Sequence, residues 1–155
     1  ATTPTAAAKS SAQVGKNTQG KIADLTEKVA VFSKMSRRLK AKKPLLDNLK
    51  LLKNAVVSID RLSDSNHKAE FNQIQRDFKA HFAYKRGNPK PTPGAKAKIT
   101  QTGKLLDARV KALSVKVSNT YMKEAKGSQM KLIKAKMDVV SEQKAQHHSK
   151  GFGKR

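Results

Sequence analysis

Residues 45–59 read LLDNLKLLKNAVVSI, and the order of their apolar side chains sets the secondary structure of this stretch. Steps of four, three, four and three residues separate Leu45, Leu49, Leu52, Val56 and Ile59. Such steps bring side chains to one face of an α-helix, whereas a half-buried strand alternates every second residue. The stretch therefore predicts an amphipathic helix, with Leu46 and Val57 broadening its apolar face.

The helical period extends toward the N-terminus. Pro44 suits the first turn of the helix and marks its start. Before it, from Gly20, a second apolar stripe skips Ser36 and consists of Ile22, Leu25, Val29, Phe32 and Leu39. Residues 1–18 are small and polar, with almost nothing to bury, and predict a flexible basic arm.

The period also extends toward the C-terminus. The sequence SDSN at 63–66 offers N-cap residues for a third helix, whose apolar face is predicted to be Phe71, Ile74, Phe78 and Phe82. Three prolines and two glycines at 87–94 predict a crossover, because they cannot continue a helix. A fourth helix from about 95 is lined by Ile99, Leu106, Val110, Leu113, Val117 and Tyr121.

A change in the phase of the stripe near Gly127 predicts a break or kink, followed by a fifth segment. The residues expected to line that segment are Met130, Ile133, Met137 and Val140. The fold class is therefore all-α, an antiparallel four- to five-helix bundle with a flexible basic N-terminal arm and a C-terminal tail. The predicted boundaries are 1–18 for the arm, 19–143 for the bundle domain and 144–155 for the basic tail.

The charge of the chain is strongly one-sided. Its 155 residues include 34 Lys or Arg and 11 Asp or Glu, which gives a net charge of +23. Such a charge opposes compaction unless a polyanion neutralises it. Lys outnumbers Arg by 27 to 7. Because Lys acts as a point charge and Arg as the fork that reads guanine edges, the balance favours attraction to phosphate or sulfate over reading of a base sequence.

Three groups of cations are the predicted contact residues for a polyanion. The junction cluster lies in SRRLKAKKP (36–44) and consists of Arg37, Arg38, Lys40, Lys42 and Lys43. The connection cluster lies in KRGNPKPTPGAKAK (85–98) and consists of Lys85, Arg86, Lys90, Lys96 and Lys98. The third group is Lys131, Lys134 and Lys136. Neither cluster contains an acid, which distinguishes them from a solvated surface of mixed charge.

The residues do not form the constellations that catalysis or cofactor binding requires. The chain has no Cys, no glycine-rich phosphate loop and no nucleophile elbow of the GxSxG type. The adjacent His147 and His148 are too few ligands for a metal site. Asp107 and Lys111 have the spacing of a surface ion pair. We therefore expect a non-enzymatic protein with no metal and no cofactor.

Aromatic residues place a further limit on the partner. Tyr84, Tyr121 and Phe152 are the only aromatic residues off the predicted stripes or at their edges. Stacking on the bases of a single strand is therefore poorly supported, and contact with a nucleic-acid backbone is favoured.

Two functions from different classes fit these features. The first is coating or packaging of nucleic acid through its backbone phosphates, with little sequence specificity. The alternative is a secreted basic helical protein, of the gamete, salivary or defence type, that binds sulfated glycans or disrupts or fuses anionic membranes. A third, weaker interpretation pairs the stripes between chains to give a homo-oligomer.

The compartment stays open at this point. Removal of an initiator Met before Ala1 is compatible with a nucleus, a nucleoid or a virion, and cleavage of a signal peptide is compatible with secretion. No apolar run approaches the length of roughly 18 residues that a membrane-spanning helix needs.

Overall fold

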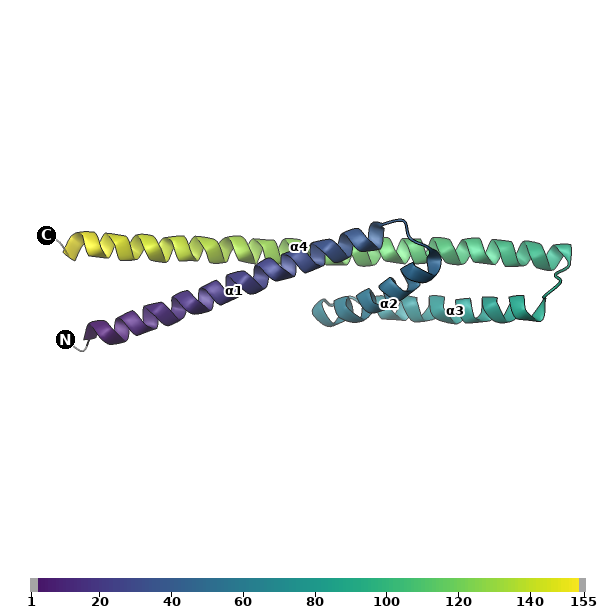
Figure 1. The fold of residues 1–155 in the computed structure, drawn as a ribbon, viewed down its shortest axis with the longest axis horizontal. Coiled ribbons are helices and arrows are strands. Elements are labelled where there is room, and N and C mark those ends of the chain that lie inside the picture. The colour runs from purple at the N-terminus through teal and green to yellow at the C-terminus, as the bar shows by residue number, and fades with distance from the viewer. Residues whose placement is uncertain (1–2, 154–155) are drawn as a thin grey trace. The chain divides into compact units, whose positions relative to one another are not determined.

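The structure, a computed structural model, describes the backbone of residues 3–153 and the side chains of residues 17–144. Figure 1 shows a ribbon of helices joined by short connections, and no strand occurs within residues 3–153. The all-α prediction is confirmed. The four helices are α1 (Thr3–Lys40), α2 (Leu45–Leu62), α3 (His67–Gly87) and α4 (Pro93–Gly153).

The chain forms two compact units, and α1 and α4 contribute residues to both. Unit 1 comprises Ala1–Phe32 and Lys123–Arg155, and unit 2 comprises Ser33–Met122. Helix α1 begins and α4 ends within the predicted arm and tail. The side chains of 1–16 and 145–155 lie outside the described part, so the predicted boundaries of arm, bundle domain and tail stay predictions.

The core of unit 2 follows the predicted stripes of α2 and α4. Leu52, Val56 and Ile59 of α2 are at most 1% exposed. The buried predicted residues of α4 are Leu106, Val110, Leu113, Val117 and Tyr121. Full burial of a large apolar side chain stabilises the fold by about 1.5–3 kcal/mol, so these faces hold the helices of the unit together.

Tyr121 combines apolar burial with a polar contact. Its phenol oxygen donates a hydrogen bond to the carbonyl oxygen of Ala55 in α2, at 2.8 Å. Burial raises the pKa of the Tyr121 phenol above its ordinary value of 10.0, and the nearby Asp60 carboxylate acts in the same direction. The side chain therefore links α2 to α4 in its neutral form.

Ser36, the residue that the predicted stripe of α1 skips, is buried with an exposed fraction of 1%. The hydroxyl of Ser118 in α4 donates to the carbonyl oxygen of Ser36, at 2.8 Å. The two hydroxyl oxygens also lie 2.8 Å apart. Because Ser118 has a single hydroxyl proton, the Ser36 hydroxyl is the donor in this second bond. A polar pair therefore fills the gap between Phe32 and Leu39.

The predicted face of α3 is correct in three positions and wrong in one. Phe71, Ile74 and Phe78 are at most 5% exposed, but Phe82 is 42% exposed. His81 takes the expected place of Phe82 and is 8% exposed. A step of three residues from Phe78 keeps the side chain on the buried face, and a step of four moves it toward solvent at this point. The apolar character of Phe82 does not override this geometry.

The start of α3 differs from the expectation that SDSN supplies a capping side chain. Asn66 is the N-cap residue, and its side chain forms no capping hydrogen bond. Instead, the carboxylate of Asp60, in the last turns of α2, accepts hydrogen bonds from the backbone N–H groups of His67 at 3.1 Å and Lys68 at 2.8 Å. A carboxylate suits these donors because the first N–H groups of a helix have no partner within it.

Replacing Asp60 with Ala is expected to lower the free energy of unfolding by about 1–2 kcal/mol, the usual cost of a lost N-cap. Asn66→Ala is the matched control and should change it by less than about 0.5 kcal/mol. Urea unfolding followed by circular dichroism measures both. A larger loss for Asn66→Ala than for Asp60→Ala would contradict the assignment of the cap.

The predicted crossover at 87–94 lies where α3 ends and α4 begins. Helix α3 ends at Gly87, and Pro93 occupies the first position of α4, where its missing N–H removes no helical hydrogen bond. Thr92 caps α4, since its side-chain oxygen accepts a hydrogen bond from the N–H of Ala95 at 3.2 Å. The connection therefore has capping contacts at its α4 end.

In unit 1, α1 and α4 lie beside one another. A groove between them is lined by Thr18 and Lys21 of α1 and by residues of α4 that include Asp138 and Ser141. Within residues 17–32, the buried apolar residues of α1 are Leu25 and Phe32, with exposed fractions of 6% and 8%.

The predicted break near Gly127 is wrong, because α4 runs from Pro93 to Gly153 without interruption. Gly127 does not have a positive φ, so it does not adopt the left-handed conformation that ends many helices. The phase of the stripe changes for another reason. Three consecutive steps of four residues lead from Leu113 through Val117 and Tyr121 to Ala125, where an alternating pattern would include a step of three.

The predicted face of the last segment is also wrong. Met130, Ile133, Met137 and Val140 are 68%, 45%, 64% and 49% exposed. The buried residues are instead Ala125, Ser128, Leu132 and Ala135. Two Ala and a Ser give a weak hydrophobic signal in the sequence, although small side chains let a second helix approach closely. The more apolar stripe of the same helix thus faces away from the packed side.

Replacing Gly127 with Ala is expected to raise the free energy of unfolding by about 0.5–1 kcal/mol, because Gly is the less stable of the two inside a helix. A methyl group at this position meets no atom within 4 Å, so no steric cost opposes the gain. Thermal unfolding followed by circular dichroism measures the effect. Destabilisation would instead indicate a helix end at this residue.

Candidate polyanion-binding surface

The junction cluster surrounds the connection between α1 and α2. Helix α1 ends at Lys40, and the chain passes through residues 41–44 before α2 begins at Leu45. The Nδ2 atom of Asn48 donates a hydrogen bond to the carbonyl oxygen of Lys43, at 3.0 Å. This contact fixes the connection against the first turn of α2. Lys43 is half-buried, and the other four cations of the cluster are exposed.

A groove of about 530 Å³ lies at this connection. Lys40, Lys42 and Lys43 line it on one side, and Lys111 and Ser114 of α4 line it on the other. The groove therefore places Lys111 beside the junction cluster. From the sequence, Lys111 was predicted only to form an ion pair with Asp107. That ion pair is confirmed, with the Lys111 Nζ atom 3.0 Å from the Asp107 carboxylate.

The connection cluster lies around the α3–α4 connection. Lys85 and Arg86 are in the last turn of α3, Lys90 is in the connection, and Lys96 and Lys98 follow in the first turns of α4. Asn88 holds the chain at the end of α3, because its Nδ2 atom donates to the carbonyl oxygen of Tyr84 at 2.9 Å. The Nζ atom of Lys98 lies 4.5 Å above the centre of the Tyr84 ring.

The two clusters do not form one continuous face. On α4, Lys98 belongs to the connection cluster and Lys111 lies beside the junction cluster, and the two residues are 13 positions apart. In an α-helix this spacing corresponds to a rise of about 20 Å and a rotation that leaves the side chains about 140° apart. The cations of unit 2 are therefore gathered at two separate connections, α1–α2 and α3–α4.

The third group lies in unit 1 and is not compact either. Lys131, Lys134 and Lys136 are all exposed. Lys131 and Lys134 lie about 60° apart around the helix axis, whereas Lys136 is about 140° from Lys131. These three lysines therefore do not converge on one anion.

None of the predicted contact residues forms an ion pair with an acid in the part of the chain described, residues 17–144. The ion pairs there join Arg109 to Asp77, Lys111 to Asp107 and Lys116 to Glu70. Ion pairs thus involve cations between the clusters and leave the clusters themselves without a carboxylate. An anionic partner would not have to displace an internal ion pair there.

Other side chains offer little for recognition of bases or metals. Tyr121 is buried, Lys98 covers one face of the Tyr84 ring, and the Phe152 side chain lies outside the described part. No three His, Asp or Glu side chains come together as metal ligands within the described residues. His147 and His148 fall outside the described side chains. No helix in the described part has an apolar stretch long enough to cross a bilayer.

Comparison with known proteins identifies no relative of this chain: no family model, no curated protein sequence and no solved structure matches it. The functional argument therefore depends on the chain's own residues.

Proposed function

We propose that the protein packages nucleic acid without catalysing a reaction, by binding backbone phosphates with little sequence specificity and bridging neighbouring duplexes. The scaffold in this proposal is the predicted antiparallel helical bundle. The observation that carries the proposal is that the junction and connection clusters lie at two separate connections of unit 2, and that within the described residues neither cluster forms an ion pair with an acid.

Bridging follows from this placement. On α4, Lys98 of the connection cluster and Lys111, which lies beside the junction cluster, leave the helix about 140° apart, so we expect a duplex bound at one cluster to leave the other cluster free. The second cluster can then bind another duplex. The rise of about 20 Å from Lys98 to Lys111 along α4 matches a length of duplex DNA that carries roughly twelve phosphates. The five cations of one cluster are too few to neutralise that many charges. Neutralisation by many copies of the protein would bring duplexes together.

The chemistry of Lys explains the expected lack of sequence preference. Each ammonium group near a phosphate releases a condensed counterion, which strengthens binding to any sequence equally. Only two Arg side chains, Arg37 and Arg38, belong to the junction cluster, and one, Arg86, belongs to the connection cluster. Reading of guanine edges, for which Arg is best suited, contributes little.

Fluorescence anisotropy with two unrelated short DNA duplexes, at several salt concentrations, tests the proposal. We expect similar affinities for both duplexes and a steep fall of affinity with salt, by about 0.9 in log–log slope for each phosphate contact. Light scattering of the same mixtures should rise as duplexes are bridged. Absence of DNA and RNA binding at about 0.15 M ionic strength would overturn the proposal.

One observation favours a second candidate, association with anionic membranes. The exposed stripe of α4, formed by Met130, Ile133, Met137 and Val140, is bordered by Lys134 and Lys136 on its two sides, each about 80° from the centre of the stripe. Apolar side chains flanked by lysines suit a helix that lies in the surface of an anionic bilayer. Sedimentation with phosphatidylserine vesicles, but not with neutral phosphatidylcholine vesicles, would favour this candidate over DNA packaging if DNA binding fails.

A further inference from the structure

A cavity of about 480 Å³ lies between α3 and α4 in unit 2, apart from the junction groove. Ala80, Leu105, Leu106 and the ring of Tyr84 provide apolar walls. Small-molecule sites in proteins usually have volumes of roughly 300–1,000 Å³ and combine apolar walls with a few polar groups. The size and the walls of this cavity are those of such a site.

His81 is the buried polar group of the cavity. It is 8% exposed and lines the cavity from α3. Its imidazole edge faces Gly103 of α4, where an added methyl group would lie 3.7 Å from Nε2. Within the described residues no side chain or backbone group forms a hydrogen bond with the His81 ring, and no fully enclosed polar atom lacks a partner, so the ring nitrogens keep some solvent exposure in a side chain that lines the cavity. An imidazole always has at least one N–H donor or ring acceptor to offer a ligand.

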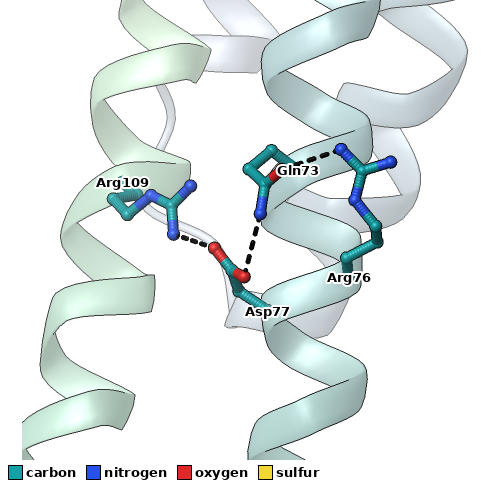
Figure 2. A network of polar contacts seen from close by, with 4 residues as sticks. All are labelled: Gln73, Arg76, Asp77 and Arg109. Atoms are coloured by element: carbon teal, nitrogen blue, oxygen red, sulfur yellow. Dashed lines mark hydrogen bonds and ion pairs between the residues drawn. The ribbon is translucent and has the colours of Figure 1, made fainter.

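The charges around the cavity leave one cation uncompensated. Figure 2 shows Arg109 of α4 and Asp77 of α3 directed at one another, with Gln73 donating a second hydrogen bond to the same carboxylate. The Arg109 hydrogen bond lowers the pKa of Asp77 below its ordinary value of 3.8, so this carboxylate is ionised at neutral pH. Lys98, the remaining charged residue of the lining, has no acidic partner within the described residues.

We propose that this cavity binds a small organic anion that has one negatively charged head group and an apolar body, such as a medium-chain carboxylate. Lys98 attracts the head group, and a ring nitrogen of His81 donates a hydrogen bond to it. Leu105, Leu106 and Ala80 cover the body. A cationic ligand would meet repulsion from Lys98, and a small inorganic anion would leave the apolar walls in contact with water. The site shares Lys98 with the connection cluster, but the proposal does not depend on the binding of nucleic acid.

Nuclear magnetic resonance of the full chain with ¹³C-labelled histidine tests the proposal, with octanoate as the probe. The expected result is a saturable shift of the His81 signal, while the signals of the other three histidines stay nearly constant. Octan-1-ol, which lacks the charge, and acetate, which lacks the apolar body, should each bind at least tenfold more weakly. Equal binding of octanol and octanoate, or equal shifts of all histidines, would overturn the proposal.

Two variants and a matched control complete the test. His81→Leu replaces the imidazole with an apolar side chain of similar size, and it should weaken octanoate binding at least tenfold. Gly103→Ala keeps His81 but places a methyl group against Nε2, and it should weaken binding at least fivefold while α4 remains helical. Gly127→Ala makes the same change in open space on the same helix and should leave the affinity unchanged. Unchanged affinity in both His81→Leu and Gly103→Ala would overturn the proposal.

Discussion

Replacing all five cations of the junction cluster with Gln is expected to reduce the log–log salt slope of DNA binding by up to about 4.5, from about 0.9 for each lost phosphate contact. At about 0.15 M salt the affinity should fall roughly a hundredfold or more. Anisotropy titrations over a series of salt concentrations measure both quantities. Light scattering should decrease more than binding, because the connection cluster still holds one duplex while bridging needs both clusters.

The ion-paired lysines provide the matched control for this variant. Lys111→Gln and Lys116→Gln remove cations that already contact Asp107 and Glu70. Each should change the slope less than Lys42→Gln does, because part of its charge is compensated in the free protein. Helicity should stay nearly constant in the five-residue variant, since all but Lys43 of these side chains are exposed. A slope that is unchanged in the five-residue variant would assign the junction cluster to the solvated end of α1 and nothing more.

Replacing Leu132 with Ala is expected to lower the free energy of unfolding by about 2–3 kcal/mol, near the lower end of the range for buried Leu. Leu132 is 4% exposed and is the largest of the buried side chains of α4 within residues 123–144. The loss combines the transfer free energy of the removed atoms with the cavity that remains. Denaturant unfolding, with probes in both units, measures the change.

Met130→Ala is the control for the Leu132 variant, because Met130 lies on the same helix but on its exposed face. Met130 is 68% exposed, so its truncation should change the free energy of unfolding by less than about 0.5 kcal/mol. If Met130→Ala were the more damaging of the two, the face predicted from apolar residues alone would be the packed one. The structure would then have the wrong side of α4 buried.

The long apolar stripes of α2 and α4 were predictable because each is a sustained helical period of large residues. Leu52, Val56 and Ile59 need no neighbour to identify them as a buried face, and all are buried. The predicted contact residues could be selected only by composition. Their degree of exposure, their lack of acidic partners within the described residues and their grouping at two connections of unit 2 follow from the structure.

The failures share a cause. Ser36, His81 and Ser128 occupy buried positions although each is polar, and Phe82, Met130 and Met137 occupy exposed ones although each is apolar. A prediction from hydrophobicity assigns each residue by its own transfer free energy. Burial in a helix depends on the angle at which the side chain leaves the axis, and a polar side chain is accepted where a neighbour satisfies it, as Ser118 does for Ser36.

The amino-acid sequence alone was enough to establish the helical class, the charge, the positions of the connections and the absence of thiol chemistry, since each depends on residue type and local spacing. Contacts between distant segments were needed for the rest. They determine which of two apolar stripes on α4 is packed, which carboxylate caps α3 and how Lys111 comes to lie beside the junction cluster. The physical reason is that local spacing specifies a helix and its faces, whereas only packing against another helix determines which face is buried.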